Sequence, residues 1–477
     1  MHQRILSGIA PALFILAAGI GGGGCVAGAR GDLERAVDAI FSEYDRADGP
    51  GAAVAVVHRG EIAFMKGYGM ANLDHAIPIT PATVFDIASV SKHFTAFAIA
   101  LLAERGRLSL DDDVRKYVPE LPDLGHTVTI RHLVHHTSGI RDWVELLYFA
   151  GYDFDDVIGI RDVFALARDQ RALNFPPGTE YMYSNTGYNL LAEIVARVDG
   201  RPFREFMAEE VFEPLGMTST EVQDDHSRIV RNRAESYEPL PDGGYRRLIN
   251  NTAAVGSSSI LTTVSDLARW ARNFENPVIG GPAVMERMQQ RGVLNDGREI
   301  DYAFGLSHGE LDGRATIGHG GSWRGFRSHF LWIPAESLTV IVVSNVTAFN
   351  AARMAQRVAR AFLGAPDIEP EGGAPRRSGS VAAAALDASR LAEYEGEYVA
   401  PELNTRYHLS ARDGRLVWRH RRHGETPLSH VAGDRFVAEG VRGQLTFEFV
   451  RDSRGRVTGY TLAGARFRNI QFEREGR

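Results

Sequence analysis

Apolar residues alternate between helical and strand spacing over the first 105 residues, and each spacing predicts a different element. Asp32 is a favourable N-cap, and the apolar residues after it recur every three or four positions, so we expect a first helix there. Residues 52–57 and 61–67 are apolar runs on either side of an Arg-Gly pair, which predicts a β-hairpin. Helical spacing returns from Ser89 to Arg105, where we expect a long helix.

The middle and later parts of the chain repeat this arrangement in reverse. Residues 130–275 are mostly helical in their spacing. Residues 330–333 and 338–343 predict a second apolar hairpin, and residues 351–362 a closing helix. Early and late strands therefore bracket a helical middle. We expect an α/β (α+β) domain in which both chain ends build one antiparallel sheet, flanked by helices and by a helical subdomain.

Composition shifts to Gly, Pro, Ala, Arg and Ser after residue 363. Such a segment cannot bury a core, so residues 364–388 are interpreted as a linker that follows a domain at 30–363. From residue 389 to 477, short apolar runs alternate with turn pairs such as Asp413-Gly414. That spacing predicts a small all-β domain, either a barrel or a sandwich.

The N-terminus has the pattern of an export signal. A basic start is followed by an apolar run and small residues, so residues 1–29 are expected to be a signal peptide that is removed. The run is too short for a stable membrane span. A secreted or periplasmic protein follows from this interpretation. The alternative is a lipoprotein that carries its lipid on Cys25.

Charge and cysteine content exclude several classes of protein. The formal net charge is −7, and no long basic run marks a nucleic-acid-binding surface. The single cysteine excludes an internal disulfide framework and multi-cysteine metal sites. We expect neither a metal nor an organic cofactor. Among 53 basic residues only Lys66, Lys92 and Lys116 are lysines, so a lysine at a chemical site is unusual in this chain.

One of these lysines follows a serine by three positions at the start of the predicted long helix. Residues three apart share a helix face, which brings the hydroxyl of Ser89 within reach of the amine of Lys92. A desolvated lysine can take the proton of a serine and make it a nucleophile, whereas an arginine cannot. The pair therefore predicts covalent catalysis.

Two further segments carry polar groups at element boundaries. Tyr183-Ser184-Asn185 lies in a loop that opens a predicted helix. The segment from His319 through Gly320, Gly321, Ser322 and Trp323 to Arg324 precedes the second hairpin, and glycines there let a substrate backbone approach a strand edge. A capped helix over packed tyrosines and a flexible turn would also explain these segments.

Together the three constellations resemble the penicillin-recognising serine hydrolases: class C β-lactamases, D-alanyl-D-alanine carboxypeptidases, D-aminopeptidases and related esterases. The SxxK motif of that family is matched by Ser89 to Lys92, its YxN motif by residues 183–185, and its KTG or HxG motif by residues 319–321. The resemblance covers residues 33–363 and implies the β-lactamase/transpeptidase-like fold. The domain after the linker resembles the lipocalin-like barrel of some D-aminopeptidase relatives.

The resemblance also implies roles for individual residues. Ser89 would be acylated, with Lys92 and Tyr183 sharing general base and acid work. Asn185 would hold the lysine and the substrate amide. The backbone N–H groups of Ser89 and Ser322 would form the oxyanion hole.

His319 departs from the lysine of the β-lactamase form, because a neutral imidazole holds a carboxylate poorly. Arg324 or Arg327 would supply that charge instead. We therefore expect a serine hydrolase that cleaves an ester or amide bond of a small molecule or short peptide, including D-amino-acid peptides. The alternatives are a non-catalytic peptidoglycan- or peptide-binding module, or a true β-lactamase. The sequence leaves the oligomeric state open.

Overall fold

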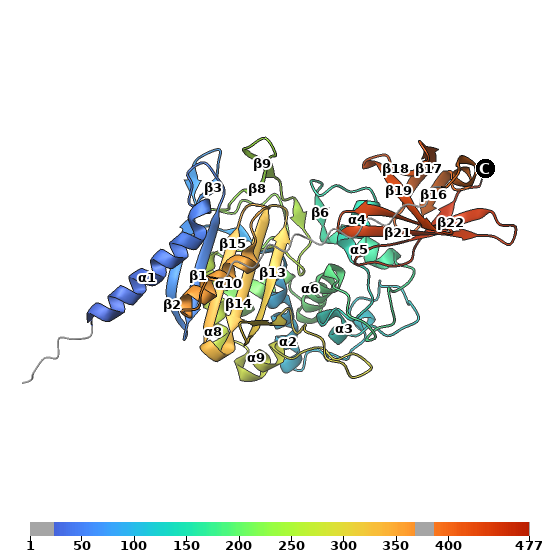
Figure 1. The fold of residues 1–477 in the computed structure, drawn as a ribbon. Coiled ribbons are helices and arrows are strands. Elements are labelled where there is room, and N and C mark those ends of the chain that lie inside the picture. Colours follow the sequence, from blue (N-terminus) through green and yellow to red (C-terminus); the bar gives the residue numbers. More distant parts are fainter. Residues whose placement is uncertain (1–22, 368–385, 477) are drawn as a thin grey trace, which may run out of the picture.

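A six-stranded antiparallel sheet forms the centre of the larger part of the molecule (Figure 1). The computed structural model describes residues 23–367 and 386–476, with side chains from residue 31 onward. The strand order is β12-β13-β14-β15-β1-β2. The strands are β1 (Ala52–His58), β2 (Glu61–Tyr68), β12 (Ser307–Leu311), β13 (Arg314–Trp323), β14 (Phe326–Ile333) and β15 (Leu338–Ser344).

Pairing between β1 and β15 joins the N-terminal and C-terminal strands into one sheet. Val54 of β1 lies opposite Val342 of β15, nearly 300 positions later in the chain. Both predicted hairpins and the antiparallel sheet built from the two chain ends are therefore confirmed.

Both faces of the sheet are covered by helices, as its strand sequences require. Val54 packs toward α1 (Gly23–Phe41) and α10 (Ala351–Phe362), whereas the next residue, Ala55, packs in the cluster on the other face. Successive strand residues point to opposite faces, so continuous apolar runs are needed where both faces are buried.

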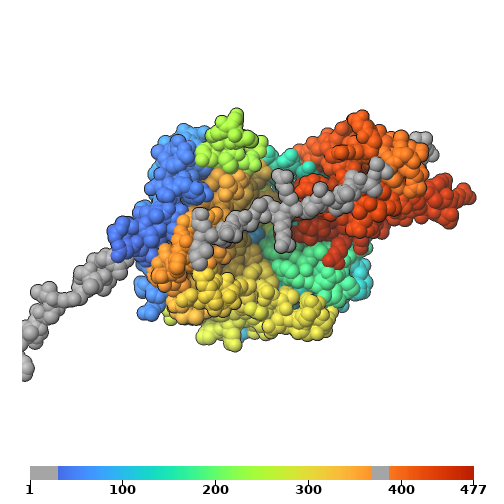
Figure 2. Space-filling view, viewed as in Figure 1, coloured from blue at the N-terminus to red at the C-terminus, as the bar shows by residue number. Residues whose placement is uncertain are grey.

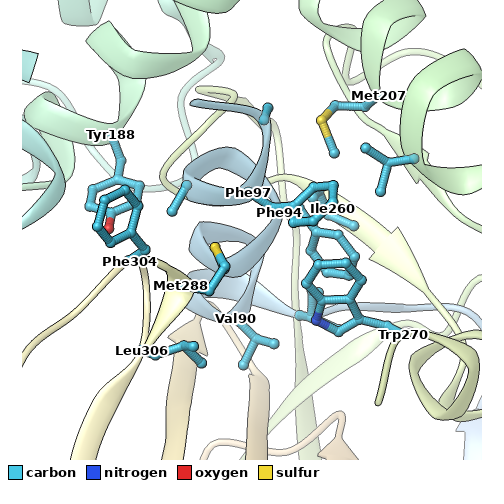
Figure 3. Packing of buried hydrophobic residues seen from close by; sticks show 14 of the residues in the cluster. Val90, Phe94, Phe97, Tyr188, Met207, Ile260, Trp270, Met288, Phe304 and Leu306 are labelled. Carbon is cyan, nitrogen blue, oxygen red and sulfur yellow. The ribbon is translucent and has the colours of Figure 1, made fainter. Parts of the chain in front are cut away.

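The second face packs on α2 (Lys92–Glu104), which is buried on all sides from its first residue to Leu102. Figure 3 shows Phe94 and Phe97 of this helix against Trp270 of α8 (Val264–Glu275). The ring centroids of Phe94 and Trp270 are 4.5 Å apart, and those of Phe97 and Trp270 are 5.3 Å apart. A helix that is apolar all round is a central core helix, so the position of its first turn is rigidly determined.

The segment predicted as mostly helical contains short strand pairs between its helices. Two two-stranded sheets and a three-stranded one interrupt it. Its helices are α3 (Ile130–Val134), α4 (Trp143–Phe149), α5 (Ile160–Asp169), α6 (Asn185–Asp199), α7 (Phe203–Met207), α8 and, beyond it, α9 (Gly281–Met288).

The C-terminal part is a closed eight-stranded antiparallel barrel, which decides between the two predicted forms of the all-β domain. Tyr407 and Trp418 stack inside it with ring centroids 3.9 Å apart. Its strands are β16 (Gly396–Ala400), β17 (Thr405–Arg412), β18 (Arg415–His420), β19 (Gly424–Ala432), β20 (Arg435–Gly440), β21 (Gly443–Arg451), β22 (Val457–Ala463) and β23 (Ile470–Arg474).

The barrel docks on the helical subdomain at α4, and the two parts meet in the space-filling view (Figure 2). Residues of α4 and α5 belong to the same apolar cluster as the barrel interior. Beside this cluster, Arg141 and Glu402 form an ion pair whose side chains are 1% and 5% exposed. Arg141 also donates from Nε to the carbonyl of Arg468 at 3.1 Å.

At the N-terminus the structure differs from the predicted helix start. Helix α1 begins at Gly23, nine residues before Asp32, which pairs with Arg35 on the helix surface instead of capping. Most of the predicted signal peptide and most of the predicted linker lie outside the described residues. Within the described ranges, no helix has the length and apolar character needed to cross a membrane.

The buried ion pair predicts how firmly the barrel is held. Glu402→Ala leaves Arg141 buried without a counter-ion, so we expect it to lower the free energy of unfolding by about 3–5 kcal/mol. Chemical denaturation measures this loss. Glu425→Ala is the matched control, because it removes the exposed Arg412–Glu425 pair of the same barrel and should cost about 0–1 kcal/mol. Equal losses in the two variants would contradict the role of the buried pair.

Candidate active site

Ser89 lies in a short 3₁₀ turn, Ala88–Ser91, that leads directly into α2. The preceding residue, Ala88, has a left-handed φ of 47°, a conformation that L-residues other than glycine adopt at a cost. The buried carboxylate of Asp86 accepts a hydrogen bond from the Ala88 N–H at 2.7 Å and holds this turn. Backbone strain is thus stored beside the predicted nucleophile, which is half-buried.

Lys92 is fully buried, and three oxygen atoms surround its amine. Nζ lies 2.8 Å from Oδ1 of Asn185, 2.7 Å from the carbonyl of Ser257 and 3.3 Å from Oγ of Ser89. Burial holds the pKa of Lys92 well below its usual 10.5, although Asp142 opposes this effect. A neutral amine has two N–H donors and one lone pair, so it can satisfy the amide and the carbonyl and still accept the proton of Ser89.

The aromatic ring of Tyr183 also lies close to the Lys92 amine. The Lys92 Nζ is 4.8 Å from the centre of the Tyr183 ring. Burial raises the pKa of Tyr183 above its usual 10, and hydrogen bonding to Ser89 only partly offsets this. The phenol is therefore protonated near neutral pH, which suits a proton donor, whereas the lysine suits a proton acceptor.

Asn185 is the first residue of α6, and a buried carboxylate orients its side chain. Its Nδ2 donates to Oδ2 of Asp142 at 2.8 Å, and Asp142 also caps α4 by accepting from the N–H of Val144. The same carboxylate oxygen accepts from Arg466 at 3.2 Å. Arg466 belongs to the loop between β22 and β23, so hydrogen bonds run from the barrel through Asp142 and Asn185 to Lys92.

The third motif lies on β13. Strand β12 pairs with β13 only as far as Gly318, so no described strand pairs with this edge of β13 beyond that residue, as the approach of a substrate backbone requires. His319 Nδ1 donates to the carbonyl of Gly320 at 2.6 Å, and Nε2 lies 3.1 Å from the hydroxyl of Tyr302. Burial lowers the pKa of His319 to about 3, so its imidazole is neutral at physiological pH.

Gly321 brings this strand against the nucleophile turn. A Cβ atom on Gly321 would lie 2.3 Å from the carbonyl oxygen of Ile87 and 2.1 Å from Oγ of Ser328. Gly320 next to it has no such contact, since its nearest neighbour would be 3.4 Å away. Only one of the two glycines is required by packing.

A cleft of about 500 Å³ brings most of the predicted residues together. Ser89, Tyr183 and Asn185 line it together with residues 319–322 of β13, and Lys92 lies beneath it. A larger cavity of about 1070 Å³ lies against the barrel at β17 and β18, and none of the predicted site residues lines it.

Arg324 is not among the residues that line this cleft, and its role in binding substrate stays a prediction. It occupies the turn between β13 and β14, where its Nε donates to the carbonyl of Ile249 at 3.0 Å and its guanidinium pairs with Asp155. These partners draw the side chain toward residues 153–155. Arg327, the alternative cation, does line the cleft.

Sequence reasoning missed four groups at the site: Asp142, Ser257, Arg442 and Arg466. Asp142 and Ser257 stand outside the three motifs, and their contacts with Asn185 and Lys92 exist only in the fold. The two arginines come from barrel loops, and the arginine-rich composition of that domain does not distinguish them from its other arginines. Within the described ranges, His, Cys, Asp and Glu side chains nowhere gather in a group of three that could hold a metal ion.

A model of the family described as "Beta-lactamase" matches residues 37–365, the part of the chain that contains the whole SxxK, YxN and HxG arrangement. The chain belongs to the β-lactamase family. A second model, described as a domain of unknown function (DUF3471), matches residues 381–474. This β-lactamase-family domain is therefore joined to a barrel whose role its own family model leaves undefined.

Similar proteins and structures agree with this assignment. The D-aminopeptidase of Gluconobacter oxydans is 32% identical over 340 residues, which are 71% of this chain but only 63% of that relative. The octameric penicillin-binding protein homologue from Pyrococcus abyssi has the same fold, with a TM-score of 0.63 and 24% identity over 93% of this chain and 99% of that chain. The D-amino acid amidase from Ochrobactrum anthropi SV3 has a TM-score of 0.59 and 21% identity over 70% and 99%.

The two glycines of the β-lactamase-family site form a matched pair. Gly321→Ala forces β13 away from Ile87, so we expect it to lower the melting temperature. We also expect the rate of Ser89 acylation to fall at least tenfold, because about 1 Å of misplacement can reduce a reaction rate by up to 10²-fold. Gly320→Ala should leave the melting temperature unchanged. Thermal unfolding of both variants, with acylation followed by mass, tests this. A fully stable Gly321→Ala protein would contradict the packing argument.

Arg466 predicts a change in pH dependence. Its positive charge disfavours protonation of Lys92, and it also offsets Asp142, which favours protonation. Arg466→Gln should therefore raise the pKa of Lys92 and move the acid limb of the kcat/KM profile to higher pH. Arg415→Gln, an exposed barrel variant with the same loss of charge, should keep the wild-type profile. An unmoved limb in Arg466→Gln would show that Arg466 does not act on the lysine.

Proposed function

We propose that this protein is a serine hydrolase that cleaves an ester or amide bond through an acyl-enzyme on Ser89. The observation that carries the proposal is the buried Lys92 amine, 3.3 Å from Ser89 Oγ and with both N–H groups engaged elsewhere. A pure binding module has no need of a desolvated base beside a serine.

Acylation begins when Oγ of Ser89 attacks the carbonyl carbon of the substrate and its proton passes to Nζ of Lys92. The substrate oxygen gains the negative charge, and we assign the backbone N–H groups of Ser89 and Ser322 as its oxyanion hole. The tetrahedral intermediate then collapses, the bond to the leaving group breaks, and Tyr183 donates the proton that the leaving oxygen or nitrogen needs. Proton transfer from Lys92 restores the phenol.

Deacylation repeats these steps with water as the nucleophile. Lys92 again accepts one proton, now from the attacking water, and Tyr183 again donates one. Ser89 leaves the tetrahedral intermediate as the free hydroxyl. No metal or organic cofactor enters this proposal.

The names of similar proteins and the third motif narrow the substrate class. A D-aminopeptidase and a D-amino acid amidase are among the similar proteins, which supports amides of D-amino acids or short D-peptides as substrates. His319 is neutral where a lysine stands in the β-lactamase form, so β-lactam hydrolysis is disfavoured.

We further propose that the protein works outside the cytoplasm, secreted or periplasmic, after removal of residues 1–29. The basic start and apolar run of that segment support export. A lipid on Cys25 would instead retain it at a membrane.

Intact-protein mass after exposure to a p-nitrophenyl ester, a D-alanyl amide and a penicillin tests the proposal. We expect an acyl adduct in the wild-type protein and none in Ser89→Ala. Lys92→Arg should fold normally but lose about 10²–10⁴-fold in turnover, because a guanidinium cannot accept the proton. The same spectra reveal whether residues 1–29 have been removed from the exported protein.

Absence of any adduct with all three compounds would favour a binding module. Wild-type turnover in Lys92→Arg would instead keep the hydrolase and refute the assigned base.

A further inference from the structure

Three guanidinium groups line the candidate active-site cleft, and no carboxylate of the described residues lines it with them. Arg327 comes from β14, Arg442 from the turn between β20 and β21, and Arg466 from the loop between β22 and β23. Two of the three therefore come from the barrel, and their ion pairs with Glu145 and Asp142 join it to the other domain.

The three cations differ in how closely an acidic side chain approaches them. Arg466 pairs with Asp142 at 3.2 Å. Arg327 donates to two backbone carbonyls, those of Arg324 and Phe326, and has no carboxylate within 4 Å among the described residues. A backbone carbonyl satisfies an N–H donor but does not neutralise its charge.

Arg442 has one acidic neighbour, at the outer limit of ion-pair distance. Its Nε lies 4.0 Å from Oε1 of Glu145, a side chain that is only 4% exposed. Burial raises the pKa of Glu145 to about 7, so this carboxyl is partly protonated near neutral pH. The guanidinium itself is one-third exposed and faces the cleft.

The third motif does not supply this positive charge. His319 donates from Nδ1 to a backbone carbonyl and is buried beside Tyr302, so it remains neutral. Next to Arg327 and Arg442, a carboxylate of a substrate would meet planar donors that match its geometry.

We propose that Arg442 of the barrel, together with Arg327, binds a carboxylate of the substrate, so that the enzyme prefers esters or amides that carry a negative charge near the scissile bond. The inference rests on the proposed hydrolase function. It gives the barrel a specificity-determining role: the barrel completes a binding site whose nucleophile belongs to the other domain.

Matched pairs of esters test the proposal. Mono-4-nitrophenyl glutarate and its methyl ester differ in one charge on the acyl side, and 3-acetoxybenzoate and its methyl ester differ in one charge on the leaving group. In at least one pair the acid should have a kcat/KM about tenfold or more above that of its methyl ester at low salt. One molar NaCl should reduce this ratio.

The ratio should fall about tenfold in Arg442→Gln, whose side chain lies in an exposed turn. Arg415→Gln removes the same charge at the start of β18, away from the turn that contains Arg442, and should keep the wild-type ratio. Ratios near one for both wild-type pairs, or a ratio unchanged in Arg442→Gln and in Arg327→Gln, would overturn the proposal.

Direct binding separates this proposal from the hydrolase function. Trp143 and Trp323 line the cleft, so their fluorescence reports binding of mono-4-nitrophenyl glutarate to Ser89→Ala without turnover. Binding that weakens about tenfold on adding Arg442→Gln supports carboxylate recognition, even if no ester is hydrolysed. Equal binding in the two variants, or none in either, refutes it. Loss of Ser89-dependent acylation alone refutes only the hydrolase.

Discussion

Desolvation of the Lys92 amine is the constraint on which the rest of this site depends. A lysine in water is protonated and cannot act as a base at neutral pH, so the fold must remove water and still satisfy the N–H groups. Helix α2 does this by being buried on all sides at the first turn that carries the lysine. The amide of Asn185 and the carbonyl of Ser257 then take the two N–H donors, which leaves the lone pair for Ser89.

The barrel is tied to this amine through Asp142. A single carboxylate caps α4, orients Asn185 and accepts from Arg466, so the docking of the barrel and the position of the lysine share one buried charge. The Arg141–Glu402 pair holds the same interface a few residues away. Removing or shifting the barrel would therefore change both the electrostatics of the lysine and the cations that face the substrate.

Periodicity was sufficient to predict the β1–β2 and β14–β15 hairpins, α10 and an all-β C-terminal domain, because their apolar runs have the spacing that burial on one or two faces requires. The Ser89–Lys92 pair was also predictable, since spacing along one helix start brings both groups together. Asp142 was not, because its partners Asn185 and Arg466 lie 43 and 324 positions away. The surroundings of Arg324 could not be predicted for the same reason: its proximity in sequence to His319 did not show that its guanidinium pairs with Asp155.

The sequence by itself determined most of the long helices and strands, the sheet built from both chain ends and the motif residues, because these depend on local spacing and on the chemistry of each side chain. Only the tertiary structure decided which arginines face the cleft, which carboxylate orients Asn185 and why there is no room for a Cβ atom at position 321. These depend on contacts between segments far apart in the chain, where direction and distance follow from packing. The positive charge of the cleft comes from arginines of two domains together, and neither domain supplies all of it.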